Sequence, residues 1–292
     1  MVNLFNYIDR ESPIHRLTGA TKLLCLLLWC LAAMTSFYTP LLIAQSLAGI
    51  VLFRISKIRF REVRFMLTLA FVFLLLNNLM IYLFSPEHGT TIYGTRTVVL
   101  TIAGPYTITL EQLFYQLNVM LKYSATIPIV LLFINTTNPS EFAASLNRIG
   151  VSYRIAYSVA LALRYVPDIQ REYHDISQAQ QARGTEMSKK ASLVKRLKAV
   201  STILIPLVLS SVARIETIAN AMELRGFGKN EKRTWYMSRK FRKADIASIA
   251  ACVAVMLVSL GLTILNGSRY FNPFICEIKT RPRSTRSGGE FR

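Results

Sequence analysis

Long apolar stretches are the feature that most constrains how this chain can fold. A helix that crosses the hydrocarbon core of a bilayer, about 30 Å thick, needs about 20 apolar residues. Three regions meet this length clearly, and a fourth, between Leu23 and Phe53, is long enough for two short helices separated by the turn signal at residues 36–40. We therefore predict an all-α integral membrane protein with about five transmembrane helices, at residues 20–37, 40–54, 65–84, 111–134 and 244–265.

Composition supports this fold class, and the distribution of basic residues orients it. Hydrophobic residues make up 52% of the chain and charged residues only 17%, a balance too apolar for a water-soluble domain. The net charge is nevertheless +19, with five Lys or Arg residues in the short connection 54–64 and nineteen in segment 136–243. Because Lys and Arg accumulate on the cytoplasmic side of membrane proteins, both are predicted to be cytoplasmic.

This orientation divides the chain into regions with different roles. The connection 85–110 combines extended segments, within residues 91–110, with turn residues, which predicts an external hairpin-like loop. The same orientation places the C-terminal tail outside, which conflicts with its basic composition. We let the two larger basic segments, 54–64 and 136–243, decide the orientation. We expect an N-terminal membrane region at 1–135, a cytoplasmic region of amphipathic coupling helices at 136–243, the last transmembrane helix at 244–265, and a disordered basic tail at 266–292.

The cytoplasmic region contains two similar halves. Apolar residues recur at helical spacing through residues 151–182 and again through residues 193–224, with polar residues between them, which predicts two long amphipathic helices. Each half carries an internal proline, Pro167 or Pro206, which removes a backbone donor and should bend or break the helix.

Both predicted helices also end in the same way, with the sequences Ala182-Arg183-Gly184 and Leu224-Arg225-Gly226. Glycine is a common helix cap because it accepts a left-handed conformation, and an arginine there interacts favourably with the helix dipole by about 0.3–1 kcal/mol. For one copy this structural explanation is sufficient. Two copies favour a pair of equivalent ends that dock into carboxylate-lined grooves on a two-fold partner.

With these motifs the chain resembles a known family, the transmembrane (T) components of energy-coupling factor (ECF) transporters, which are ABC-type importers of prokaryotes. The resemblance covers most of the chain. The matching motifs are Ser12-Pro13-Ile14-His15-Arg16-Leu17 with Thr21-Lys22-Leu23, Asn138-Pro139-Ser140-Glu141 with Leu146-Asn147-Arg148-Ile149-Gly150, Leu163-Arg164-Tyr165-Val166-Pro167, and the two Arg-Gly helix ends. In two places the chain departs from the family pattern, with Thr18-Gly19-Ala20 for an Asp-Pro-Arg-like triplet and Leu224 for alanine.

The resemblance implies a transport function and specific partners. It implies that Arg183 and Arg225 dock into grooves of two ABC ATPase subunits, which form a homo- or heterodimer. It also implies that the amphipathic helix faces cradle a small membrane-embedded substrate-binding (S) component. The protein would then be a multi-pass coupling subunit in a prokaryotic cell membrane, serving uptake of a vitamin or metal ion, with Pro167 and Pro206 as helix bends.

The motifs of other function classes are missing from the sequence. It contains no G-x-x-x-x-G-K-[ST] phosphate-binding loop, so ATP hydrolysis is expected in partner subunits rather than here. Its histidines are widely separated, and we expect no catalytic residues, metal site or cofactor. The basic stretch 229–243 precedes a transmembrane helix, which favours anionic lipid headgroups over nucleic acid as its partner.

One alternative function and two residue roles stay open at this point. The alternative is an integral-membrane enzyme whose cytoplasmic site is built from Asp168, Glu172, Asp175 and Glu186, although Arg164 and Arg171 lie nearby and favour a self-paired surface. Within the membrane region, Asn77 and Asn78 could join helices or line a path, and Lys122 could reach the interface or pair with a carboxylate such as Glu111.

Overall fold

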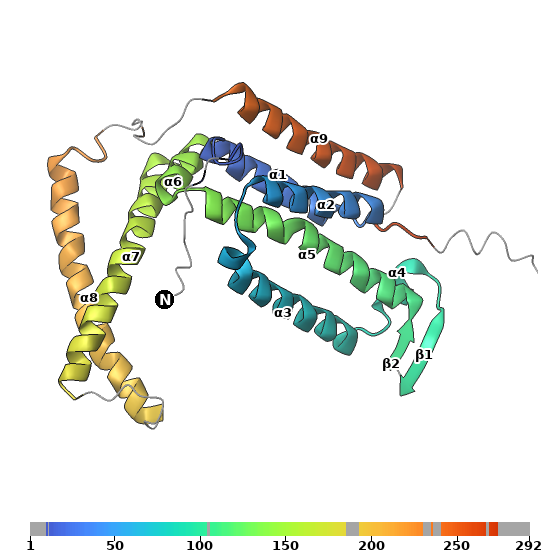
Figure 1. The fold of residues 1–292 in the computed structure, drawn as a ribbon, viewed down its shortest axis with the longest axis horizontal. Helices are drawn as coiled ribbons and strands as arrows, with labels where there is room; N and C mark the ends of the chain where they lie inside the picture. The colour runs from blue at the N-terminus through green and yellow to red at the C-terminus, as the bar shows by residue number, and fades with distance from the viewer. Residues whose placement is uncertain are drawn as a thin grey trace, which may run out of the picture. The chain divides into compact units, whose positions relative to one another are not determined.

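A computed structural model of the chain, drawn in Figure 1, describes residues 10, 12–103, 106–184, 193–229, 235, 241–266 and 269–273. Within these residues the chain is mostly helical, with one two-stranded hairpin. It forms two compact units. Unit 1 comprises residues 1–17, 21–136 and 242–292, and unit 2 comprises residues 18–20 and 137–241.

Unit 1 contains the five helices that the apolar stretches predict, and this confirms an all-α membrane protein. Three of them, α3, α5 and α9, are long and apolar enough to cross a membrane, whereas α1 and α2 have 17 residues each. Small residues allow α2 and α5 to pack closely, and the Ser46 and Ser124 hydroxyls lie 2.6 Å apart between them. The bounds are α1 Gly19–Thr35, α2 Thr39–Ile55, α3 Phe60–Phe84, α5 Leu110–Thr136 and α9 Lys243–Leu265.

Lys122 of α5 binds the C-terminal end of α1. Its Nζ donates a hydrogen bond of 3.1 Å to the Met34 carbonyl and lies 3.3 Å from the centroid of the Phe37 ring. Cations are favourable at a helix C-terminus because the last carbonyls have no partner within the helix. Glu111 does not pair with Lys122, because its carboxylate accepts hydrogen bonds from the backbone and hydroxyl of Thr97.

Residues that follow α9 also pack against the end of α1. The Phe37 backbone N–H donates to the Arg269 carbonyl at 2.8 Å, and the Phe37 and Tyr270 rings lie 4.7 Å apart. The Asn272 amide donates to the Tyr93 carbonyl at 3.0 Å. Residues 269–273 therefore have a defined structure within the tail that we expected to be disordered, because aromatic packing outweighs the local basic composition. Residues 274–292 lie outside the described residues.

The connection between α3 and α5 contains the expected hairpin, preceded by a short helix. Strands β1 Val98–Ala103 and β2 Tyr106–Thr109 pair antiparallel, with Val98 opposite Thr109. The prediction of extended structure is wrong for residues 91–93, which belong to α4 His88–Tyr93. This helix forms because Gly94 caps it in a left-handed conformation with φ of +70° and donates its N–H to the Thr90 carbonyl.

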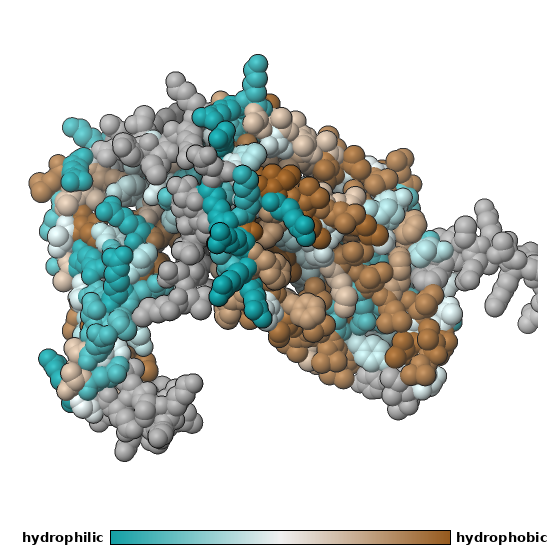
Figure 2. Space-filling model, viewed as in Figure 1, coloured by the Kyte–Doolittle hydropathy of each residue, from teal (hydrophilic) through white to brown (hydrophobic). Residues whose placement is uncertain are grey.

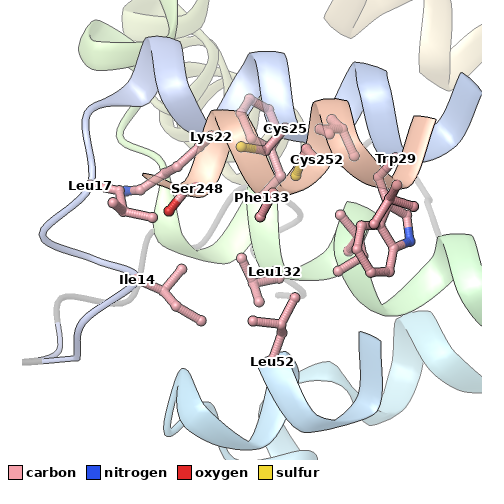
Figure 3. A pocket seen from close by; sticks show the side chains of 14 residues that line it. Ile14, Leu17, Lys22, Cys25, Trp29, Leu52, Leu132, Phe133, Ser248 and Cys252 are labelled. Carbon is pink, nitrogen blue, oxygen red and sulfur yellow. The ribbon is translucent and has the colours of Figure 1, made fainter. Parts of the chain in front are cut away.

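A cavity of 230 Å³ lies among α1, α2, α5 and α9 in unit 1 (Figure 3). Its lining is mostly apolar, and the thiols of Cys25 and Cys252 lie within hydrogen-bonding reach of each other. Seven residues further along each helix, the Ser259 hydroxyl donates to the Ala32 carbonyl at 2.9 Å. Matching contacts at this equal spacing show that α1 and α9 pack in parallel through small residues.

The described residues of unit 2 form three helices, α6 Pro139–Arg148, α7 Tyr153–Ala182 and α8 Leu193–Leu224. The two predicted amphipathic helices are confirmed, and both are continuous through Pro167 and Pro206, so neither proline breaks its helix. Residues 199–224 of α8 are also long and apolar enough to cross a membrane, which the sequence patterns did not predict. Hydrophilic residues cover much of α7 on the face that Figure 2 shows.

Candidate functional site

The first Arg-Gly sequence forms the exposed C-terminal end of α7. Arg183 is the capping residue, and its backbone N–H donates to the Ala179 and Gln180 carbonyls at 3.2 and 3.1 Å. Gly184 follows with φ of +83°, and its N–H donates to the Gln181 carbonyl. A residue with a Cβ is strained in this conformation, so glycine lets the helix stop directly after the arginine.

The second Arg-Gly sequence repeats this geometry at the end of α8. Gly226 has φ of +64° and donates to the Glu223 carbonyl at 2.8 Å, while the Phe227 N–H donates to the Met222 carbonyl at 2.9 Å. These two bonds form a Schellman motif. Leu224 has 90% of its surface exposed, and Arg225 is also exposed.

The end of α6 shows that arginine is not required for this cap. There the Gly150 N–H donates to the Asn147 carbonyl and the Val151 N–H to the Leu146 carbonyl, which is again a Schellman motif. The capping residue before the glycine is Ile149 rather than arginine. Glycine therefore explains the helix ends, and the capping geometry leaves the choice of Arg183 and Arg225 unexplained.

Helices α7 and α8 pack antiparallel, so the two Arg-Gly ends lie at opposite ends of the pair. The Tyr157 ring near the start of α7 lies 4.7 Å from the Phe227 ring just after α8. In the middle of the pair, Arg214 Nη2 lies 2.6 Å from Glu172 Oε2. Figure 1 shows the two helices running past each other. With 30 residues, α7 is about 45 Å long, which sets the scale of the separation.

Comparison with known proteins agrees with this architecture. The family model described as "Cobalt transport protein" (CbiQ) matches residues 10–236. The chain is 31% identical over 284 residues to the Energy-coupling factor transporter transmembrane protein EcfT 1 of Listeria monocytogenes, an alignment covering 91% of this chain and 98% of that protein. The T components form one family. This chain belongs to it.

Two further T components of bacteria are similar over different lengths. The EcfT of Thermosediminibacter oceani is 29% identical over 276 residues, which are 89% of this chain and 96% of that protein. The EcfT of Leuconostoc gelidum is 32% identical over 170 residues, which are 56% of this chain and 63% of that protein. Family membership and the apolar helices together identify a multi-pass transporter component of the cell membrane. Both Arg-Gly ends fall within the region that the family model matches.

An aromatic cluster supports the second Arg-Gly end of this T component. Phe227 packs against the rings of Tyr153 and Tyr157, and Trp235 lies 5.4 Å from the ring of Tyr153. The Trp235 indole N–H donates to the Asn147 side-chain oxygen at 3.1 Å. A pocket of 510 Å³ lies beside it, lined by apolar residues and Glu223. The sequence patterns missed this cluster, because its members belong to three separate segments of unit 2.

Two carboxylates of the alternative enzyme site, Glu172 and Asp168, form separate ion pairs. Glu172 accepts hydrogen bonds from Arg214 and from the Ser210 hydroxyl, both on α8. Asp168 lies 3.7 Å from Arg171 on an exposed part of α7, as its spacing predicts. Glu186 lies outside the described residues. The partner of Glu172 comes from the neighbouring helix, so Glu172 joins α7 to α8.

We expect the Glu172–Arg214 pair to hold the α7–α8 pair together measurably. A double-mutant cycle with Glu172→Ala and Arg214→Ala should give a coupling energy of about 1 kcal/mol, because both groups are partly buried and hydrogen-bonded. Thermal and denaturant unfolding of the detergent-solubilised protein measures it. The control cycle with Asp168→Ala and Arg171→Ala should give less than about 0.5 kcal/mol, because that ion pair is exposed. Equal coupling energies in the two cycles would contradict this assignment.

Proposed function

We propose that this T component couples ATP hydrolysis by two ABC ATPase subunits to uptake through a membrane-embedded S component, and catalyses no reaction itself. The observation that carries the proposal is the pair of exposed Arg-Gly helix ends at opposite ends of α7 and α8. An antiparallel helix pair relates its two ends by an approximate two-fold axis. A homodimer or heterodimer of ATPases offers two equivalent grooves with the same symmetry.

Arginine suits the proposed contact chemically. The guanidinium group presents several donors in a planar fork and binds a carboxylate through two parallel hydrogen bonds. Because glycine stops each helix directly after the arginine, the arginine stands at the tip and can enter a groove. In the proposed complex, the groove of one ATPase binds Ala182, Arg183 and Gly184. The groove of the other binds Leu224, Arg225 and Gly226.

The proposal requires both tips on the cytoplasmic side, so α8 should lie along the membrane surface rather than across the bilayer. Its partner α7 supports this placement, because α7 carries exposed charges on Arg154, Arg164 and Asp175 that would be costly in hydrocarbon. If the antiparallel pair crossed the membrane, the two arginines would lie on opposite sides. The many basic residues of segment 136–243 also favour the cytoplasm.

The proposed S component binds the exposed apolar face of α8. Successive apolar side chains on this face are 37–65% exposed, and their spacing places them on one side of the helix. A contiguous apolar surface of this kind fits a partner that is itself apolar and membrane-embedded. The face consists of Val200, Leu204, Ile205, Val208, Leu209, Val212 and Ile215.

The proposed cargo is a vitamin or a metal ion. The matching family model is described as a cobalt transport protein, and the relatives are energy-coupling factor transporter proteins. In the proposed complex the S component selects the cargo, so the T component needs no cargo site of its own. The engagement of Glu172 and Asp168 in separate ion pairs favours this function over the alternative carboxylate enzyme.

The experiment that tests the proposal asks on which side of the membrane the two tips lie. Single cysteines replace Gln181 and Glu223, exposed neighbours of the tips, in a chain whose four cysteines are changed to serine. We expect a membrane-impermeant maleimide to label both positions in inside-out vesicles and neither in right-side-out vesicles. Bound ATPase subunits should protect both positions. Labelling of the two positions from opposite sides would overturn the proposal.

A further inference from the structure

The turn between α2 and α3 in unit 1 carries a group of exposed basic side chains. Helix α2 ends at Ile55 and α3 begins at Phe60, so residues 56–59 alone connect two apolar helices. We call residues 54–64 the basic turn. Its five Lys and Arg side chains are all exposed, and they are Arg54, Lys57, Arg59, Arg61 and Arg64. A surface with this much charge of one sign attracts a ligand of the opposite sign.

Buried residues anchor the basic turn and leave its cations on the surface. Ser56 and Ile58 are buried, and the Ser56 hydroxyl donates to the Phe53 carbonyl at 2.6 Å. Lys57 and Arg59, each next to a buried residue, are exposed. The fold of unit 1 therefore holds one side of the turn and presents the basic side chains on the other.

Lys57 has a backbone conformation that is uncommon for a residue with a side chain. Its φ is +58°, in the left-handed region that favours glycine. The Arg10 guanidinium donates to the Lys57 carbonyl, and the Lys57 N–H donates to the Arg54 carbonyl at 3.2 Å. Glycine would fit this backbone at lower cost. The backbone therefore does not explain the lysine, which favours a role for its side chain.

The one acidic residue of the basic turn does not neutralise these five cations. Glu62 Oε1 lies 2.6 Å from Arg10 Nη2, outside the turn, and Glu62 Oε2 accepts a hydrogen bond from the Arg59 backbone N–H at 3.2 Å. Both carboxylate oxygens are therefore occupied by other groups. Among the residues that the structure describes, none of the five basic side chains forms an ion pair. Their charge favours an anionic partner.

Exposed apolar side chains lie beside the cations of the basic turn. Phe60, between Arg59 and Arg61, has 67% of its surface exposed, and Ile55 and Phe65 are also exposed. Because α3 is long and apolar enough to cross a membrane, its first turn lies where hydrocarbon meets the headgroups. A soluble anion would bind the cations alone. A phospholipid offers a phosphate to the cations and acyl chains to the apolar groups.

We propose that the basic turn binds an anionic phospholipid, with Lys57, Arg59 and Arg61 against its phosphate and Phe60 against its acyl chains. Clusters of Lys and Arg beside a membrane-crossing helix attract anionic headgroups. The guanidinium groups of Arg59 and Arg61 bind phosphate oxygens through paired hydrogen bonds. A zwitterionic lipid such as phosphatidylcholine has no net charge, so it binds this site less tightly.

Fluorescence quenching by brominated lipids tests the proposal, because bromine on an acyl chain quenches a tryptophan that it contacts. The full-length protein is reconstituted in vesicles of phosphatidylglycerol and phosphatidylcholine in equal amounts, with bromine on one lipid or the other. Phe60→Trp is compared with the parent, whose two tryptophans give the background. We expect brominated phosphatidylglycerol to quench the added fluorescence about twofold or more as strongly as brominated phosphatidylcholine. High salt should reduce this preference.

Phe84→Trp is the matched control at the opposite end of the same helix. Phe84 is the last residue of α3 and has 78% of its surface exposed. The connection that follows contains a single arginine, Arg96, which pairs with Glu87. The two brominated lipids should therefore quench this tryptophan equally. Equal quenching of Phe60→Trp by the two lipids would overturn the proposal.

Removing the cations identifies their role in the same measurement. In the Phe60→Trp chain, Lys57→Gln, Arg59→Gln and Arg61→Gln together should abolish the preference for phosphatidylglycerol. If this variant cannot be reconstituted, Lys57→Gln alone decides, and it should lower the preference. A preference that survives removal of the cations would overturn the site. Loss of the preference when purified ATPase subunits are added would assign the basic turn to a protein partner, and would also overturn it.

Discussion

Replacing both Arg183 and Arg225 by alanine is expected to separate the T component from its ATPases and abolish uptake. A hydrogen-bonded ion pair that is desolvated on docking costs about 2 to 5 kcal/mol when one partner is truncated. Each lost contact should therefore weaken ATPase association by about 30-fold or more. Co-purification of the ATPases and uptake by reconstituted vesicles measure the two effects. Each single variant should retain one docked tip and show an intermediate loss.

The matched control removes two positive charges from the same unit but not from the helix ends. Arg154→Ala with Arg171→Ala changes exposed residues of α7, and it should leave ATPase association within about twofold, because exposed ion pairs contribute little. Helix content by circular dichroism should be unchanged in both double variants, because glycine and not arginine forms the caps. Normal uptake by Arg183→Ala/Arg225→Ala would refute the docking assignment.

The second large effect is expected on the apolar face of α8. Val208 has 57% of its surface exposed near the middle of this face. Val208→Asp would place a carboxylate against an apolar, membrane-embedded partner, at a cost of about 2.5 to 3.5 kcal/mol. S-component capture should weaken on the order of 100-fold. The ATPases should still co-purify, because the helix ends are unchanged, and uptake should be lost.

Thr217→Asp is the control for the added charge. Thr217 lies nine residues after Val208, which is half a turn away around the helix, and its side chain is exposed. This variant adds the same charge to the opposite face and should bind the S component normally. If Val208→Asp and Thr217→Asp capture the S component equally well, the apolar face of α8 is not its binding surface.

Some features of this T component could be predicted because they depend on residues close together in the chain. The helical periodicity of α7 and α8 follows from repeats of three and four residues, and their ends at 182 and 224 follow from Gly184 and Gly226. One local signal was missed. Asn138 caps α6, Pro139 begins it and Glu141 stands in its first turn, which together are typical of a helix start.

Other features could not be predicted because their partners are distant in sequence. Lys122 binds the Met34 carbonyl, 88 positions away, rather than the carboxylate of Glu111. Gly19 and Glu141 are 122 positions apart. Sequence spacing says which side of a helix a residue occupies, but it does not say which other helix that side meets.

The sequence alone determined that this is a helical membrane protein of the T-component family, with two Arg-Gly helix ends. Hydropathy, helical period and glycine act over one or two helical turns, so they can be recognised without a structure. Only the tertiary structure decided that those ends lie at opposite ends of an antiparallel pair, that Glu172 binds Arg214, and that the Gly19 N–H binds Glu141. Packing removes polar groups on different helices from water, and each group then needs a hydrogen-bond partner in the protein. Such contacts therefore depend on which helices pack together.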